Sequence, residues 1–151
     1  MLSGPLDAAR QAPRSEPDCP GKTSAVRLAL PPQKATILCV DDDPDALAVL
    51  AWFLAAEGLE VVTACNGSEA LLRVEELLPD IIITDYIMPC MTGLELCDRL
   101  RKSEKTRGIP IIVYTALRLP AHSGLYDRTF LKPTDFDVFS VEIRSLLDRN
   151  H

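Results

Sequence analysis

Three signals that mark special classes of protein are missing from this chain. The five cysteines form no Cys-x-x-Cys pair and are odd in number, so we interpret them as reduced thiols that pack as small hydrophobic groups, not as a disulfide framework or a zinc site. No apolar run is long enough to span a bilayer, and the N-terminus lacks the basic-then-apolar order of a signal peptide. We therefore expect a cytoplasmic protein that does not insert into membranes.

Positive charge is also scarce. The net charge of the 151 residues is −6, which argues against nucleic-acid binding as the main activity. Residues 1–34 differ from the rest, because they carry five Lys/Arg against three Asp/Glu and half of the 12 prolines. They also show no sustained hydrophobic periodicity. We predict a disordered tail over residues 1–34 and a single domain over residues 35–151.

Beyond this tail, short apolar runs alternate with helical patterns. Ile81, Ile82 and Ile83 stand side by side without polar alternation, which is typical of a strand buried on both faces. Strands that alternate with helices predict an α/β fold with a doubly wound, five-stranded parallel sheet. The predicted strands are residues 35–40, 60–64, 80–84, 111–114 and 128–131.

Capping residues predict where the helices begin. Trp52, in the first helix, is expected to be a core or half-buried packing residue. Pro44 suits the first position of that helix, and Gly58 suits its end. The predicted caps of the four helices are Asp43, Asn66, Thr92 and Thr134.

Polar side chains follow several predicted strands at their carboxyl ends, where open α/β sheets bind ligands. They are Asp41, Asp42, Asp85, Thr115 and Lys132. Three clustered carboxylates need compensation if all are to stay ionised, and Mg²⁺ with its preference for oxygen ligands is a natural one. An aspartate can act as a nucleophile that forms an aspartyl-phosphate, and a lysine and a hydroxyl can neutralise the phosphoryl oxygens. Taken singly, each residue is better explained without a function: Asp85 as a strand end, Thr115 as a turn residue and Lys132 as a solvated surface lysine.

Five stretches resemble the receiver domains of two-component response regulators, in the order and near the spacing of that family. Together they cover about residues 35–149. The stretches are 37–44 (ILCVDDDP), 63–71 (TACNGSEAL), 83–96 (ITDYIMPCMTGLEL), 111–116 (IIVYTA) and 130–133 (FLKP).

The resemblance implies a flavodoxin-like fold with strand order 2-1-3-4-5 and roles for individual residues. Asp85 would accept a phosphoryl group from a histidine kinase or a histidine phosphotransfer protein. Asp41 and Asp42 resemble the acidic pair that binds Mg²⁺ together with Asp85, and Ile87 would offer its backbone carbonyl to the ion. The remaining implied roles are a switch hydroxyl at Thr115, a phosphate-binding lysine at Lys132, and a cis bond before Pro133.

Two departures from the family pattern concern signal output. Thr129 stands at a switch position on the fifth strand that is usually aromatic, beside Phe130. Residues 116–127 form a shorter segment than usual and contain Pro120 and Gly124, which predicts a shortened or irregular fourth helix. We expect partners to read the signal elsewhere, at the first helix or at the loop after Asp85.

The leading hypothesis is a stand-alone receiver whose phosphorylation on Asp85 switches its protein contacts, without enzymatic turnover or direct contact with nucleic acid. The alternative is a phosphorylation-independent pseudo-receiver that serves as an interaction module, which Thr129 and the short fourth segment favour. A phosphohydrolase is a third class. It is disfavoured because Ile87 stands where an acid–base aspartate would be needed.

Overall fold

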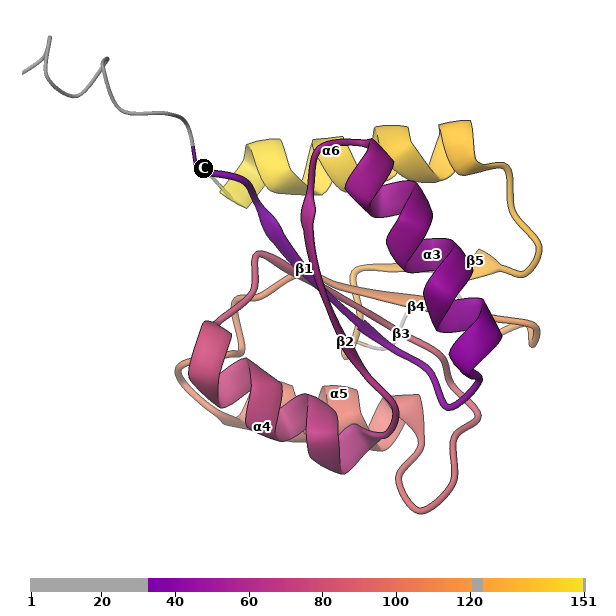
Figure 1. The fold of residues 1–151 in the computed structure, drawn as a ribbon. Helices are drawn as coiled ribbons and strands as arrows, with labels where there is room; N and C mark the ends of the chain where they lie inside the picture. The colour runs from indigo at the N-terminus through magenta and orange to yellow at the C-terminus, as the bar shows by residue number, and fades with distance from the viewer. Residues whose placement is uncertain (1–32, 121–123, 151) are drawn as a thin grey trace, which may run out of the picture. The chain divides into compact units, whose positions relative to one another are not determined.

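A computed structural model of the chain describes residues 33–120 and 124–150, and Figure 1 labels its elements. The predicted tail therefore lies almost entirely outside the described residues. Within the described ranges, no helix has the length and hydropathy needed to cross a membrane. The elements are β1 (Thr36–Val40), α3 (Pro44–Ala56), β2 (Glu60–Ala64), α4 (Gly67–Leu77), β3 (Ile81–Thr84), α5 (Gly93–Lys102), β4 (Ile111–Thr115), β5 (Arg128–Leu131) and α6 (Phe136–Asn150).

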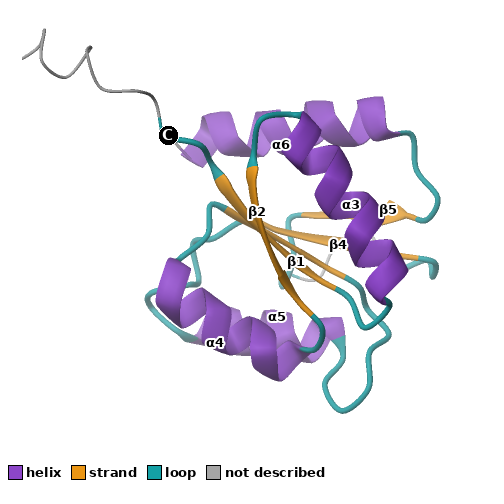
Figure 2. Cartoon of the chain, in the orientation of Figure 1, coloured by secondary structure: helices purple, strands orange, loops and turns teal. Residues whose placement is uncertain are grey.

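The five strands form one parallel sheet in the order β2-β1-β3-β4-β5. Helices α3 and α6 cover one face, and α4 and α5 cover the other (Figures 1 and 2). The predicted fold class is confirmed. The strand limits differ from the prediction by one residue at three places, because β1 begins at Thr36, β3 begins at Ile81, and β4 ends at Thr115.

Side-chain alternation along the strands produces two separate hydrophobic cores. In β3, Ile81 and Ile83 pack on the α3/α6 side, whereas Ile82 packs on the α4/α5 side. All three isoleucines are fully buried, which explains the unbroken apolar run in the sequence. The sheet is thereby held rigidly from both sides, with the carboxyl ends of its strands at one edge.

Most predicted caps are present, and one is wrong. The Asp43 carboxylate accepts a hydrogen bond from the amide of Asp45, and Thr92 and Glu95 form a reciprocal capping box. The last helix is capped by Asp135, whose carboxylate accepts a 2.8 Å hydrogen bond from the amide of Asp137. Thr134 lies one residue too early for this role, because the helix begins at Phe136.

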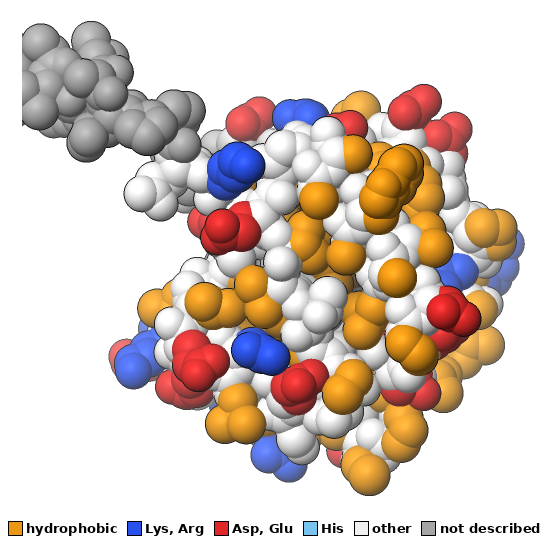
Figure 3. All heavy atoms as spheres, viewed as in Figure 1, with side chains coloured by type: hydrophobic (Ala, Val, Ile, Leu, Met, Phe, Trp, Pro, Cys, Tyr) orange, Lys and Arg blue, Asp and Glu red, His pale blue; other side chains and the backbone are white. Residues whose placement is uncertain are grey.

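Trp52 is not a core residue, which corrects the sequence-based expectation. Its side chain is 74% exposed, and Val49 beside it is also exposed. The residues of α3 that face the sheet are Leu47, Leu50 and Leu54, and Trp52 lies about 200° around the helix from Leu50. Figure 3 shows hydrophobic side chains on the solvent side of this helix.

No helix occurs between β4 and β5 within residues 116–120 and 124–127, as the short segment predicted. Leu119, Leu125 and Tyr126 pack against the α4/α5 core in its place. Arg101 of α5 anchors the start of β5, since its guanidinium donates a 2.8 Å hydrogen bond to the carboxylate of Asp127. Side-chain packing and this ion pair thus replace a regular helix on that edge.

Candidate functional site

The sheet register places Asp41 and Asp85 side by side. β1 and β3 pair so that Val40 is level with Thr84, and each aspartate follows directly. The amide of Asp85 donates a 3.0 Å hydrogen bond to the carbonyl of Val40. Two buried strands therefore deliver one aspartate each to the same edge of the sheet.

Both carboxylates are oriented by nearby backbone amides. Oδ1 of Asp41 accepts a 3.0 Å hydrogen bond from the amide of Asp43, and Oδ1 of Asp85 accepts one of 2.7 Å from the amide of Tyr86. Asp41 is buried. Each carboxylate keeps its second oxygen for the interior of the site.

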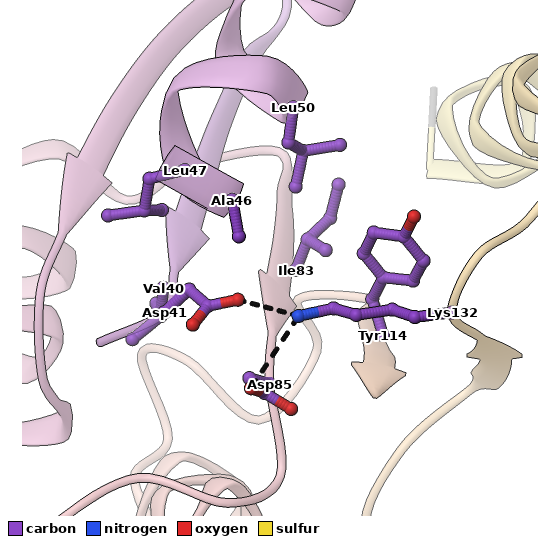
Figure 4. Close-up of a pocket in the computed structure, with 9 residues that line it drawn as sticks. All are labelled: Val40, Asp41, Ala46, Leu47, Leu50, Ile83, Asp85, Tyr114 and Lys132. Atoms are coloured by element: carbon purple, nitrogen blue, oxygen red, sulfur yellow. Dashed lines mark hydrogen bonds and ion pairs between the residues drawn. The ribbon is translucent and has the colours of Figure 1, made fainter. Parts of the chain in front are cut away.

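Lys132 joins the two aspartates, as Figure 4 shows. Its Nζ lies 2.7 Å from Oδ2 of Asp41 and 3.6 Å from Oδ2 of Asp85. Burial by itself lowers the pKa of the lysine. The hydrogen bond and charge of Asp41, together with the charge of Asp85, outweigh burial and raise the pKa above its ordinary value. The ammonium is therefore a permanent cation at neutral pH.

Asp42 completes an acidic cluster with Asp41 and Asp85. One carboxylate oxygen from each residue lies within 4.8 Å of the others. Three negative charges and one lysine leave the cluster with an excess of negative charge. An all-oxygen donor set with that excess fits a hard divalent cation such as Mg²⁺, which binds one or two carboxylates and keeps several waters.

The loop from Asp85 to Gly93 is held closely against the site. The amide of Gly93 donates a 2.8 Å hydrogen bond to the carbonyl of Tyr86, and Met88 and Met91 of the loop bury their side chains in the α4/α5 core. Ile87 exposes its side chain here. The contribution of its carbonyl to metal binding stays a prediction.

Thr115 ends β4, and Lys132 directly follows the neighbouring strand β5. The amide of Lys132 donates a 2.8 Å hydrogen bond to the carbonyl of Thr115, and the bond between Lys132 and Pro133 is cis. The buried Thr115 hydroxyl accepts a 3.4 Å hydrogen bond from the amide of Leu117. It does not line the pocket formed around Asp41, Asp85 and Lys132, so its switch role stays a prediction.

Thr129, at the switch position of β5, and the neighbouring Phe130 face opposite ways. Thr129 is exposed. Phe130 packs with the α3/α6 core, where its ring lies 4.8 Å from that of Phe139 in an edge-on arrangement. Of these two residues, the aromatic one packs on the α3/α6 side of β5.

Sequence reasoning missed Tyr114 as a site residue. The ring lines the pocket beside Lys132, with its centroid 5.2 Å from Nζ. Burial raises the pKa of the phenol, partly offset by the charge of Lys132 and a backbone hydrogen bond at Thr134. Strand parity was the available signal, since Tyr114 has the same parity as the buried Ile112 and so points to the α3/α6 side.

The fold and the site together define an open α/β protein with an acidic, cation-compatible pocket at the carboxyl ends of its central strands. Residues 37–123 match the response regulator receiver domain family. The chain belongs to this family of two-component signalling domains.

Relatives and solved structures agree with this assignment. The chain is 46% identical over 80 residues to the phosphate regulon transcriptional regulatory protein PhoB of Rhizobium meliloti (strain 1021), a match that covers 52% of this chain and 35% of PhoB. It is 35% identical over 120 residues to the DNA-binding response regulator MtrA of Mycolicibacterium smegmatis, covering 76% of this chain and 51% of MtrA.

A solved structure, response regulator TrrA of Thermotoga maritima in complex with Mg²⁺–BeF, superimposes with a TM-score of 0.69 at 33% identity, covering 74% of this chain and 98% of TrrA. The chain spans about half the length, or less, of the two curated relatives. Receiver domains bind Mg²⁺ at an acidic pocket and accept phosphoryl groups from histidine kinases or phosphotransfer proteins. They are generally phosphoacceptors without enzymatic activity of their own.

Proposed function

We propose that residues 35–151 form a receiver domain in which Asp85 is the phosphoacceptor of a Mg²⁺-dependent switch. The observation that carries the proposal is the lysine bridge. Nζ of Lys132 lies 2.7 Å from the Asp41 carboxylate and 3.6 Å from that of Asp85. One cation thus contacts both the proposed metal-binding carboxylate and the proposed phosphoryl-accepting carboxylate.

The chemistry is a phosphoryl transfer to a carboxylate oxygen. Oδ2 of Asp85, the oxygen that faces Nζ of Lys132, attacks phosphorus, the bond from phosphorus to the donor nitrogen of histidine breaks, and an acyl phosphate remains. The leaving imidazole keeps the electron pair of the broken bond. Lys132 is placed to contact a phosphoryl oxygen near Asp85, and Thr115 is the proposed hydroxyl donor.

Asp41, Asp42, Asp85 and the carbonyl of Ile87 would hold the metal. When bound, Mg²⁺ neutralises charge on the phosphoryl oxygens. The clustered carboxylate oxygens support this donor set, and the TrrA complex with Mg²⁺–BeF is a precedent in a relative. The donor would be a histidine kinase or a histidine phosphotransfer protein.

The test is the intact mass of the protein after incubation with Mg²⁺ and a small-molecule phosphodonor. We expect one added phosphoryl group that is absent without Mg²⁺ and absent in Asp85→Asn. Asp43→Asn is the matched control, because Asp43 caps α3 and lies outside the acidic cluster. It should be phosphorylated like the wild type. Phosphorylation of Asp85→Asn to the same extent would refute the assignment.

A second candidate function is a phosphorylation-independent interaction module. The exposed Thr129 and the absence of a helix within residues 116–120 and 124–127 favour it, because both alter the surface that usually reports the switch. Partner binding that is equal for wild type, phosphorylated protein and Asp85→Asn would select this alternative. A preference of the partner for one phosphorylation state would exclude it.

A further inference from the structure

We propose that Tyr114 is a positioning residue for Lys132 and connects that lysine to the helical layer formed by α3 and α6. The inference rests on the proposed function, since it concerns how the phosphate-binding lysine is held. It adds Tyr114 to the proposed site, which so far consists of the carboxylates, the Thr115 hydroxyl and Lys132. It also indicates that a change at the site is transmitted toward α3 and α6 in a chain that has Thr129 in place of an aromatic residue.

The first step of the argument is the contact between the ring and the ammonium. Tyr114 lies in β4, and its ring stands beside the lysine side chain as Nζ reaches between the two aspartates (Figure 4). The centroid lies 5.2 Å from Nζ, within the range in which the face of an aromatic ring attracts a cation. The ammonium is thus held by two carboxylates on one side and a ring on the other.

The second step concerns the freedom of the lysine. A lysine side chain has a flexible four-carbon stem, and that of Lys132 remains 24% exposed. Without a wall, the stem has open rotamers that point to solvent. In the proposed role, the Tyr114 ring, which lines the pocket beside this stem, limits these rotamers and keeps the ammonium near Asp41 and Asp85. A catalytic point charge that is already in place saves the entropy of ordering it during the reaction.

The third step is the connection away from the site. The Tyr114 ring lies 5.1 Å from the ring of Phe139 in α6, and Phe139 also contacts Phe130. Phe136, at the start of the same helix, stacks at 4.4 Å on Phe53 of α3. Within the described residues, these aromatic contacts all lie on the α3/α6 side of the sheet. A displacement of Lys132 would therefore change the packing of Tyr114 and, through Phe139, the packing of α6.

The experiment compares Tyr114→Phe, Tyr114→Leu and the control Phe53→Leu. Phe53 belongs to the same aromatic layer, and its ring stacks on Phe136 away from the lysine. The first readout is the rate of phosphorylation by a small-molecule phosphodonor at saturating Mg²⁺. We expect wild-type rates for Tyr114→Phe and Phe53→Leu, and a rate about three- to tenfold lower for Tyr114→Leu, the factor lost with a cation–ring contact of ordinary strength.

The second readout separates positioning from a loss of structure. In wild-type protein, the ring should shift the NMR signals of the Lys132 methylene protons upfield of those of the exposed Lys102. This shift should persist in Tyr114→Phe and disappear in Tyr114→Leu. If Tyr114→Leu does not fold, Tyr114→Met replaces it, and the wild-type shift already tests the contact.

The outcomes distinguish this inference from the proposed function. A wild-type protein that is not phosphorylated on Asp85 would overturn the proposed function. A phosphorylated wild type with an equal rate in Tyr114→Leu, or with lysine methylene signals at their ordinary positions, would overturn the positioning role alone. An equal slowing in Phe53→Leu would also overturn it, because a general loosening of the aromatic layer would then explain the effect.

Discussion

A methyl group added at Gly93 should damage the loop from Asp85 to Gly93 more than the same change at Gly67 or Gly108 damages the domain. Gly93 is the first residue of α5 and lies directly against the backbone of Asp85. A Cβ atom at this position would lie 2.0 Å from the carbonyl oxygen of Asp85 and 3.0 Å from the Cα of Tyr86. The obstacle is main chain, which cannot rotate away as a side chain can. The loop or the helix must therefore move by about 1.5 Å to restore ordinary contact distances of about 3.5 Å.

The cost follows from two contributions. Forcing an extra carbon into a closely packed region typically costs about 1–3 kcal/mol. The same movement strains the 2.8 Å hydrogen bond from the Gly93 amide to Tyr86, which is worth about 1 kcal/mol. The better helix propensity of alanine returns less than about 1 kcal/mol. We expect a net loss of about 3 kcal/mol, or a Tm lowered by about 10 °C for a domain of this size.

The effect on chemistry should exceed the effect on stability. The displaced carbonyl belongs to Asp85, the proposed phosphoacceptor, and Thr84 donates a 2.9 Å hydrogen bond to that same oxygen. A 1 Å displacement of a reacting group can slow a reaction about a hundredfold. The assay is therefore a pair of measurements on Gly93→Ala, thermal unfolding and the rate of phosphorylation by a small-molecule phosphodonor.

Two other glycines supply matched controls. A Cβ atom at Gly67, which also begins a helix, would meet Sδ of Met91 at 2.6 Å, but a flexible side-chain end can move aside. At Gly108 nothing lies within 4 Å. Both alanine variants should stay within about 1 kcal/mol of the wild type. If Gly93→Ala keeps its Tm and its rate to the same degree, the close approach of the two backbone segments is wrong.

Three further predictions test other parts of the structure. Arg101→Ala should lower the free energy of unfolding by about 2 kcal/mol in urea titrations, because three hydrogen bonds of a largely buried side chain are lost. The exposed Lys102→Ala should cost less than about 0.5 kcal/mol, and equal effects would contradict the anchoring role. Trp52→Ala should also cost less than about 0.5 kcal/mol, and the tryptophan emission should be readily quenched by acrylamide, whereas a loss of about 3 kcal/mol would restore the core interpretation. Burial raises the pKa of the Cys97 thiol to about 12 and also raises that of Cys39, so the folded state keeps protons that the unfolded state releases. Stability should then fall as the pH rises above about 9, by up to about 1.4 kcal/mol per pH unit for each thiol, and a slope unchanged in Cys97→Ala would contradict this.

Features that depend on neighbours in sequence were predictable. The caps Asp43 and Thr92 act on amides two or three residues away, so their spacing alone identifies them. The meeting of Asp41 and Asp85 was predictable as well, because parallel strands bring their carboxyl ends to one edge. A one-residue choice between Thr134 and Asp135 was not, since either side chain can cap a helix.

The solvent face of α3 was beyond sequence reasoning for a physical reason. The helix contains a single charged residue, Asp45, so its hydrophobic pattern does not distinguish a buried stripe from an exposed one. Only the packing of three leucines against the sheet decides which side Trp52 faces. Tyr114 was not predicted as a site residue for another reason. The sequence pattern indicated the polar Thr115 that follows it, and the contact of the Tyr114 ring with Lys132 depends on the pairing of β4 with β5.

The charge balance of the site leads to a last prediction, which concerns Lys132 as the counter-ion of the unphosphorylated acidic cluster. Its ammonium lies closer to Asp41 than to Asp85, and it competes with any added cation for the same oxygens. Lys132→Ala should therefore bind Mg²⁺ about tenfold more tightly than the wild type, since one repelling charge at a few ångströms is removed from a partly solvated site. The same variant should be phosphorylated more slowly, because no ammonium remains to meet the phosphoryl oxygens beside Asp85. Mg²⁺ titration by calorimetry measures the first effect, with Lys102→Ala as the control for a lysine remote from the site. Unchanged or weaker Mg²⁺ binding in Lys132→Ala would mean that the lysine does not neutralise the charge of these carboxylates. The ion pair between Lys132 and Asp41 would then have no effect on metal binding.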